Sequence, residues 1–297
     1  MKSTCMRRLL PYVLVVCVVL AGCNGVFVTE SDDQTPTLTP VAVPTDEPTP
    51  TPVPRLAPGL TADGVTNASA LAAAHLDTFE NTSFTMQETV VYRSEDGIPI
   101  RRIESTTRVG DDGRFRVTKR WNGSTALQQV GYYDDGERVL VTTTRTNDAT
   151  TYRRLSSQAV AAQRSSVSDG GSGRIETMFV AAETRVAGRT ERNGTTVYHL
   201  VPTGTRGNSS NTATILDRSV SVCARVTERG LVRNYTLTQR LSGDGADGAT
   251  TIVVSARYTA IGATDIERPA WYERAVAATD PTASRRNETS ATPTTAG

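Results

Sequence analysis

Apolar and polar residues alternate along much of the chain. In residues 84–92 and 115–121, the alternate positions are mostly apolar or aromatic, and the residues between them are mostly polar. The same alternation returns in residues 220–226, 231–241 and 252–258. A period of two is typical of a β-strand that buries one face and exposes the other.

Other segments have helical spacing. In residues 67–79, Leu71, Leu76 and Phe79 recur on one side of a helix that Thr66 or Asn67 can cap. Residues 156–167 and 174–182 also read as helices. Pro269 suits the first position of a helix and predicts a short closing helix that plugs one edge of the sheet.

Turn-forming pairs such as Asp96-Gly97 and Asn193-Gly194 separate the alternating segments and supply the backbone angles of tight hairpins. We therefore predict an α+β fold. It consists of a single strongly curved antiparallel sheet, a half-barrel of about 9–11 strands, with helices covering its apolar face.

The N-terminus has the layout of an export signal. Lys2, Arg7 and Arg8 precede a 12-residue apolar run, residues 9–20, which is followed by L-A-G-C ending at Cys23. The run is shorter than the roughly 20 residues that span a bilayer. An ordinary signal peptide with a chance cysteine is the alternative to a lipid-modified one, and Arg7-Arg8 leaves both Sec and twin-arginine export open.

L-A-G-C resembles the lipobox of bacterial and archaeal lipoproteins, whose cysteine becomes the first mature residue and carries lipid. This resemblance implies a signal peptide at 1–22 and a lipidated Cys23. It also implies an exported protein anchored to the outer face of the cytoplasmic membrane, with its domain extracellular.

Composition divides the rest of the chain. Eight of the 14 prolines lie between residues 24 and 58, and few apolar residues accompany them. We expect residues 23–59 to be the lipidated cysteine and a disordered linker, 60–279 one globular domain, and 280–297 a disordered tail.

Charge and cysteine content argue against a nucleic-acid-binding protein and a disulfide-stabilised fold. Removing residues 1–22 leaves 29 basic and 31 acidic residues, a formal charge of −2, so we expect no nucleic-acid partner. A lipidated Cys23 leaves only Cys223, which excludes an intrachain disulfide. Cys223 reads as a small strand residue on a polar face.

One helix, a long antiparallel meander, covering helices and a lipobox linker together resemble the LolA/LolB and LppX/LprG lipoproteins. Three segments also resemble a group of haloarchaeal surface lipoproteins of unknown function: V-T-N-A-S-A-L-A-A-A-H at 65–75, N-G-T-T-V-Y-H-L at 193–200 and R-P-A-W-Y at 268–272. The resemblance covers roughly residues 60–278. It implies a half-open barrel under helices that holds lipid acyl chains, and so a LolA-like domain.

N-x-S/T sequons fit an exported glycoprotein. Asn67 is the weakest of them, because a helix cap would use its side chain. The candidates for glycosylation are Asn81, Asn122, Asn193, Asn208, Asn234 and Asn287.

No motif supports catalysis. Residues 243–248 match G-x-G-x-x-G but precede a strand, so they read as a hairpin loop, with a loose calcium loop as the alternative. His75 and His199 lack partners at metal spacing and read as core histidines. We expect no enzyme, no catalytic residue, no metal and no cofactor.

Glu88 stands among apolar residues on the face that should be buried. Either a bulge turns it outward, or it meets a partner or a ligand's polar group in a wet cavity. Arginine-rich outer faces, such as those of Arg114, Arg116 and Arg120, read as solvated, with anionic lipid heads or surface glycans as the alternative partners.

We expect a monomer that binds or carries a lipid or other hydrophobic molecule in an apolar groove. The alternative is a structural or interaction module of the cell envelope, whose core is filled by its own helices and which has no ligand. A large apolar cavity would favour the first and ordinary core packing the second. The candidate groove residues are Phe84, Met86, Glu88, Val90, Tyr235 and Leu237.

Overall fold

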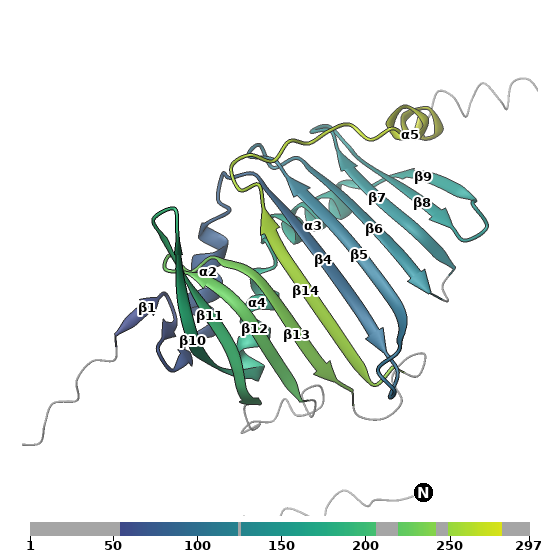
Figure 1. Cartoon of the computed structure of the whole chain (residues 1–297). Coiled ribbons are helices and arrows are strands. Elements are labelled where there is room, and N and C mark those ends of the chain that lie inside the picture. The colour runs from purple at the N-terminus through teal and green to yellow at the C-terminus, as the bar shows by residue number, and fades with distance from the viewer. Residues whose placement is uncertain (1–53, 124–125, 206–218, 242–248, 281–297) are drawn as a thin grey trace, which may run out of the picture. The chain divides into compact units, whose positions relative to one another are not determined.

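The computed structural model describes residues 54–123, 126–205, 219–241 and 249–280 (Figure 1). The expected lipidation site Cys23, the signal peptide and residues 23–53 of the linker lie outside these ranges, and so do Asn208, Asn287 and the loop 243–248. No helix in the described ranges is long and apolar enough to cross a membrane.

Eleven antiparallel strands form one large sheet. Strands adjacent in sequence pair with each other, and β14 pairs with β4 to join the two halves of the meander. Across the sheet, the strands are β10 (Ala182–Arg192), β11 (Thr195–Thr205), β12 (Val220–Thr227), β13 (Val232–Arg240), β14 (Thr251–Thr259), β4 (Phe84–Arg93), β5 (Pro99–Val109), β6 (Phe115–Gly123), β7 (Leu127–Asp134), β8 (Val139–Arg145) and β9 (Thr150–Arg154).

The α+β class and the antiparallel meander are confirmed, and the strand number lies within the expected range. The sheet is open: β10 and β9 are its two edge strands and do not pair with each other. The strong curvature of a half-barrel is not confirmed, since the strands form a twisted open sheet (Figure 1).

Three helices lie on one face of the sheet, which we call the inner face: α2 (Ala68–Asp77), α3 (Ser157–Ser168) and α4 (Ser172–Ala181). They are behind the sheet in Figure 1 and contribute to the same hydrophobic core as the strands. The Asn67 side chain caps α2 by accepting the backbone N–H of Ala70 at 2.9 Å. The expectation that helices cover the apolar face is confirmed.

The closing helix α5 (Tyr272–Thr279) lies on the opposite face, which we call the outer face. Leu140 of β8 clusters with Tyr272 and Ala275 of α5, whereas the adjacent Val139 belongs to the inner core. A closing helix is confirmed, but it begins after Pro269 and covers the outer face of the last strands. It lies at one edge of the sheet, as expected, but packs on the outer face of the edge strand β9 and its neighbour β8.

A small sheet precedes α2 and consists of β1 (Arg55–Ala57), β2 (Leu60–Thr61) and β3 (Gly64–Val65). It meets the edge of the large sheet, where the Val186 N–H donates to the Ala62 carbonyl at 3.3 Å. Ala57 is buried, so the packed part of the chain begins before residue 60.

Candidate functional site

The strand register arranges the inner-face side chains in rows that run across the sheet. Three neighbouring rows differ in chemistry. The covered row is Tyr258, Met86, Thr107 and Val117; the polar row is Tyr235, Ala256, Glu88, Ser105 and Lys119; the open row is Leu237, Val254, Val90, Ile103 and Trp121.

The part of the inner face under the helices is densely packed. Phe84, Phe115 and Phe179 are at most 1% exposed, and the Phe79 and Phe84 rings lie 4.2 Å apart. Phe84 and Tyr235, two of the candidate groove residues, are buried in this core, and Met86 packs against it. Ordinary packing here is what the self-filled alternative requires.

His75 lies within this packed region, as expected for a core histidine. Its Nδ1 accepts the Val232 backbone N–H at 3.2 Å, so its Nε2 carries the proton that is donated to the Gly170 carbonyl, also at 3.2 Å. The Tyr258 hydroxyl donates to the same carbonyl at 2.6 Å. Burial lowers the pKa of His75 from 6.5 to about 4 and keeps the ring neutral.

Glu88 stays on the inner face, because the strand register is continuous at this residue on both sides of β4. Its carboxylate pairs with the guanidinium of Arg174 in α4 at 3.0 Å, and its side chain is 17% exposed. Of the two alternatives for Glu88, the outward bulge is therefore wrong and a charged partner is present. The pair stands at the boundary between the packed core and the open row.

Tyr235 lies beside this pair. Its hydroxyl is buried and has no hydrogen-bond partner. Burial raises the pKa of Tyr235 to about 12, although the nearby Arg174 guanidinium acts in the opposite direction. The hydroxyl is therefore neutral.

The open row continues the apolar surface beyond the helices. Val90, Leu237, Ile103 and Trp121 are all only partly buried, although they face the same side as the core. Five strands about 4.8 Å apart give the row a length of about 19 Å. Val254 in the middle of the row is buried in the core, and Val90 and Leu237 pack against that core, so the row is an apolar surface with partial exposure.

Cationic groups border the open row. Lys119 is exposed in the adjacent polar row, and Arg174 is 45% exposed. On the other side of the row, the Arg101 guanidinium stacks over the Tyr92 ring at 3.8 Å from its centroid. An amphiphile could place its chain on the strip and an anionic group at its border.

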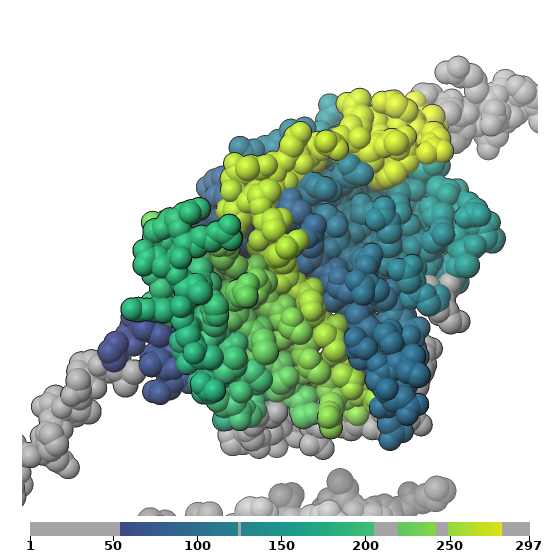
Figure 2. Space-filling view, in the orientation of Figure 1, coloured from purple at the N-terminus to yellow at the C-terminus, as the bar shows by residue number. Residues whose placement is uncertain are grey.

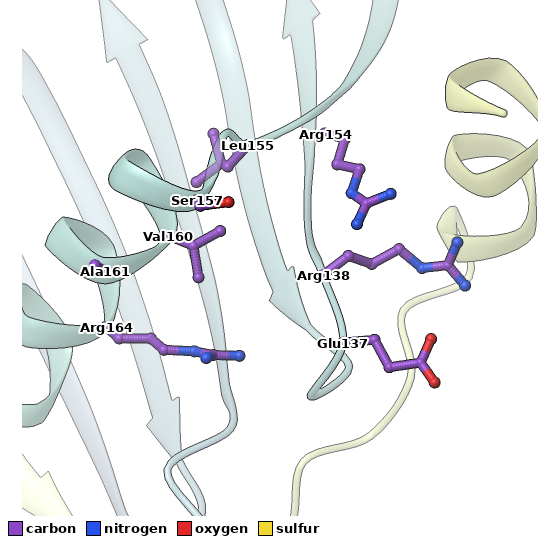
Figure 3. A pocket seen from close by; sticks show the side chains of 8 residues that line it. All are labelled: Glu137, Arg138, Arg154, Leu155, Ser157, Val160, Ala161 and Arg164. Atoms are coloured by element: carbon purple, nitrogen blue, oxygen red, sulfur yellow. The ribbon is translucent and has the colours of Figure 1, made fainter. Parts of the chain in front are cut away.

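A cleft of about 300 Å³ opens between α3 and the last strands of the sheet (Figure 3). Val160 and Leu155 form its apolar part, and Arg138, Arg154 and Arg164 give it charge. Only Val167 of the 12 residues in α3 is fully buried. The helix thus covers the sheet with little apolar contact.

One ion pair holds α3 to the sheet. Arg164 donates two hydrogen bonds to the Asp134 carboxylate of β7, at 2.6 and 2.9 Å. Asp134 is completely buried, and its Oδ1 also accepts the Gly136 N–H at 2.9 Å. This bidentate pair fixes the position of a helix that is otherwise weakly packed.

The other candidate residues lie on the surface. Asn81, Asn122 and Asn193 are exposed, whereas Asn234 is half-buried on the outer face of β13. Cys223 is exposed and free. The reading of His199 as a core histidine is wrong: it lies half-buried on the outer face and its Nε2 is 3.1 Å from the Thr190 hydroxyl.

Within the described ranges, no group of three or more His, Cys, Asp or Glu side chains is arranged to hold a metal ion. Arg114 pairs with Asp112, and Arg116 donates to the Glu267 carbonyl at 3.3 Å. Burial and the neighbouring Arg108 lower the pKa of Arg116. The expected solvated face is therefore partly engaged in local contacts.

Comparisons with known proteins give similarity only at the level of structure. No protein-family model matches the chain, and no curated protein sequence matches it significantly. Solved structures that it resembles include LprF from Mycobacterium bovis, at 8% identity and a TM-score of 0.36, with 68% of this chain and 95% of that chain covered.

Two further similar structures are the lipoprotein LppX from Mycobacterium tuberculosis and a LolA superfamily protein from Nitrosomonas europaea. LppX has 11% identity and a TM-score of 0.34, with 66% of this chain and 94% of that chain covered. The LolA superfamily protein has 11% identity and a TM-score of 0.26, with 68% and 95% covered. All three TM-scores are below 0.5, so the function proposed next rests on the residues of this chain.

Proposed function

We propose that this protein is an exported lipoprotein that binds the apolar chain of a lipid or similar amphiphile along the open row. In this proposal residues 1–22 are a signal peptide, Cys23 carries the lipid anchor, and a proline-rich linker holds a monomeric domain outside the cytoplasmic membrane.

The observation that carries the proposal is the incomplete burial of the open row. Val90, Ile103 and Trp121 are neighbours on three adjacent strands, lie on the core side of the sheet and are only partly buried. Covering such a strip with an apolar chain removes it from water, at about 25 cal/mol for each Å² buried. The proposed activity is binding and not catalysis.

The borders of the row favour an amphiphile over a plain hydrocarbon. Lys119 presents positive charge next to the apolar side chains, and the half-exposed Arg174 lies at the same border in its pair with Glu88. A phosphate or carboxylate head group would accept charge-assisted hydrogen bonds there while its chain lies on Ile103 and Val90.

A second candidate function is a structural or interaction module without a ligand. The dense packing around Phe84 and Phe179, which leaves both side chains at most 1% exposed, favours it. In that case the open row is a contact surface of the cell envelope, and the protein does not extract lipid from a membrane.

The two tryptophans separate these functions. Trp121 lies in the open row, whereas Trp271 clusters with α5 on the outer face. We expect a brominated fatty acid to quench tryptophan fluorescence saturably in the chain and in Trp271→Phe. Trp121→Phe should bind but show little quenching, because bromine quenches at contact.

Charge placed on either face of β13 provides the matched control. Leu237→Glu on the inner face should abolish quenching, and Thr236→Glu on the outer face should leave it unchanged. Native mass spectrometry with organic extraction should find a stoichiometric lipid on the protein from its own organism. A folded protein that carries no lipid and takes up none would contradict lipid binding and favour the second function, a structural module without a ligand.

The anchor is tested separately. The membrane-bound chain should carry a mass increase on Cys23 and partition into detergent, and Cys23→Ser should release the protein in soluble form. A soluble wild-type protein with an unmodified Cys23 would contradict the anchor without affecting the binding proposal.

A further inference from the structure

A second pocket lies on the outer face, away from the open row and the helices. It has a volume of about 520 Å³, and its walls come from β10, β11, β12, β13 and β14. Four arginines line it: Arg192, Arg225, Arg233 and Arg257. The only carboxylate in the lining is Glu191, and the other polar residues include Thr190, His199, Asn234 and Thr259.

Two β-bulges shape this pocket. Arg225 pairs with Asn234, and the next pair is Val226 with Val232, so Arg233 is an extra residue on β13. A bulge of this kind places two consecutive side chains on one face, here Arg233 and Asn234.

The second bulge lies in the β10–β11 hairpin. Val186 pairs with Leu200 and Gly188 with His199, which leaves Ala187 as the extra residue. The added twist brings the end of the hairpin over the outer face, so that Arg192 lines the same pocket as Arg257, four strands away. In Figure 2 the green hairpin and the yellow C-terminal segment border a recess on this side.

The register places the charged groups at regular intervals across the floor. His199, Arg225, Asn234 and Arg257 stand opposite one another on four adjacent strands. Arg225 and Arg257 therefore flank Asn234 at about 4.8 Å on either side. Arg225, Asn234 and Arg257 thus line one pocket from three adjacent strands.

These arginines differ from six others in the described part of the chain. Arg102, Arg114, Arg138, Arg164, Arg174 and Arg268 each form an ion pair with a carboxylate. In contrast, Arg257 donates to the neutral side chain of Gln87 at 2.9 Å, and none of the four pocket arginines pairs with a carboxylate among the described residues.

Like charges on neighbouring strands destabilise a sheet unless a counter-charge is present. We propose that the pocket above Asn234 binds a phosphate-type oxyanion, with Arg225 and Arg257 as its principal ligands and the Asn234 amide as a further donor. The planar guanidinium donates two parallel hydrogen bonds to such an anion, which is the geometry that this residue type favours. Arg192 and Arg233 form the sides of the pocket.

Asn234 belongs to a sequon, and a glycan on it would fill this pocket. The proposal therefore requires an unmodified Asn234 in the native protein, although the exposed Asn193 on the nearby hairpin remains free to be modified. Peptide mapping of protein from its own organism decides this, and complete glycosylation of Asn234 would overturn the proposal.

Binding is measured by calorimetry on the full chain in a non-ionic detergent at low salt. One arm uses inorganic pyrophosphate, and the other uses glycerophosphoglycerol, a soluble lipid head group. Saturable binding of pyrophosphate alone assigns a free phosphate, and binding of glycerophosphoglycerol assigns a lipid head group. Binding of neither probe overturns the proposal.

Variants locate the site. Arg225→Gln and Arg257→Gln should each weaken binding about tenfold or more, and the double variant should abolish it. Arg120→Gln removes the same charge from the outer face of β6, where Arg120 donates to the neutral Gln129, and should bind normally. Equal losses in all three variants would indicate nonspecific attraction and overturn the proposal.

Thermal unfolding gives an independent readout. Pyrophosphate should raise the Tm of the wild-type chain, because it binds the folded state. Arg225→Gln should show an equal or higher Tm without the anion and no rise with it, since it relieves charge repulsion. A merely structural arginine would instead lower the Tm in both conditions.

Discussion

The backbone N–H of Val232 donates a hydrogen bond to Nδ1 of His75 at 3.2 Å. This contact joins the start of β13 to α2 and requires an unprotonated Nδ1. Since Nε2 donates to the Gly170 carbonyl, both ring nitrogens are used only when the imidazole is neutral. These two contacts between α2 and its surroundings therefore require a neutral His75.

Acidification should destabilise the protein through His75. Its pKa is about 4 in the folded state and 6.5 as its ordinary value, so the unfolded chain binds the proton more readily between these values. Stability from this group is present above pH 6.5 and falls by about 3 kcal/mol as the pH drops to about 4. Urea unfolding at several pH values checks this.

His75→Gln is the control for that titration. It should be less stable at pH 7, because Gln replaces the two ring contacts imperfectly, but its stability should change less between pH 6.5 and 4. An unchanged slope in this variant would assign the acid sensitivity to other groups.

The Glu88–Arg174 pair should show coupling in a double-mutant cycle. Glu88→Gln, Arg174→Gln and the double variant should give a coupling of about 1 kcal/mol, modest because Arg174 is 45% exposed. Arg174→Gln should cost more than Glu88→Gln, since it leaves a carboxylate on an apolar face. Chemical denaturation measures the free energy of unfolding of each variant. If the two single substitutions add up to the double variant, the pairing is contradicted.

Two buried tyrosines should respond differently to loss of the hydroxyl. Tyr235→Phe removes a group without a hydrogen-bond partner and should be neutral within about 0.5 kcal/mol, or stabilising. Tyr258→Phe breaks the hydrogen bond to the Gly170 carbonyl and should cost about 1 kcal/mol. Thermal and urea unfolding of the two variants measure these changes in stability. Equal losses of stability would contradict the predicted difference between the two hydroxyls.

Gly170 should tolerate no side chain. Its φ is +58°, and a Cβ would lie 2.5 Å from the Phe79 ring, so Gly170→Ala should destabilise by about 3 kcal/mol. Gly194→Ala has a similar φ of +70° but nothing within 4 Å, and should cost only about 1 kcal/mol. The difference between the two losses in the free energy of unfolding isolates the contact with Phe79.

Amide hydrogen exchange should be faster in α3 than in α2 or α4. Only Val167 of α3 is fully buried, whereas α4 buries Ile175, Met178 and Phe179. Arg164→Gln should accelerate exchange in α3 further, because it removes the pair with Asp134. Uniform exchange across the three helices would show that α3 is held as firmly as the others.

Much of the fold follows from alternation, but not all of it. The alternating segments identify β4, β6 and β12–β14, whereas they do not single out β5. On its inner face β5 carries Thr107, Ser105 and Arg101, whose polarity hides the pattern. Its pairing with β4 and β6, and not its own composition, decides that it is a strand.

The site is harder to predict than the fold. Phe84 and Val90 belong to the same alternating series, but one is buried in the core and the other partly faces solvent. The difference depends on where α4 and α3 end above the sheet, which no local pattern records. The bulge at Arg233 is equally invisible, because it depends on the register with β12.

An open sheet has two edge strands to which further strands can add. Its edge strands β10 and β9 expose backbone donors and acceptors that another copy of the chain could extend into a continuous sheet. The small β1–β3 sheet caps part of one edge through the Ala62 carbonyl, and Arg189 and Arg192 give the rest charge. Arg153 and Arg154 do the same on β9. The charged edges thus oppose extension of the sheet by a second copy of the chain.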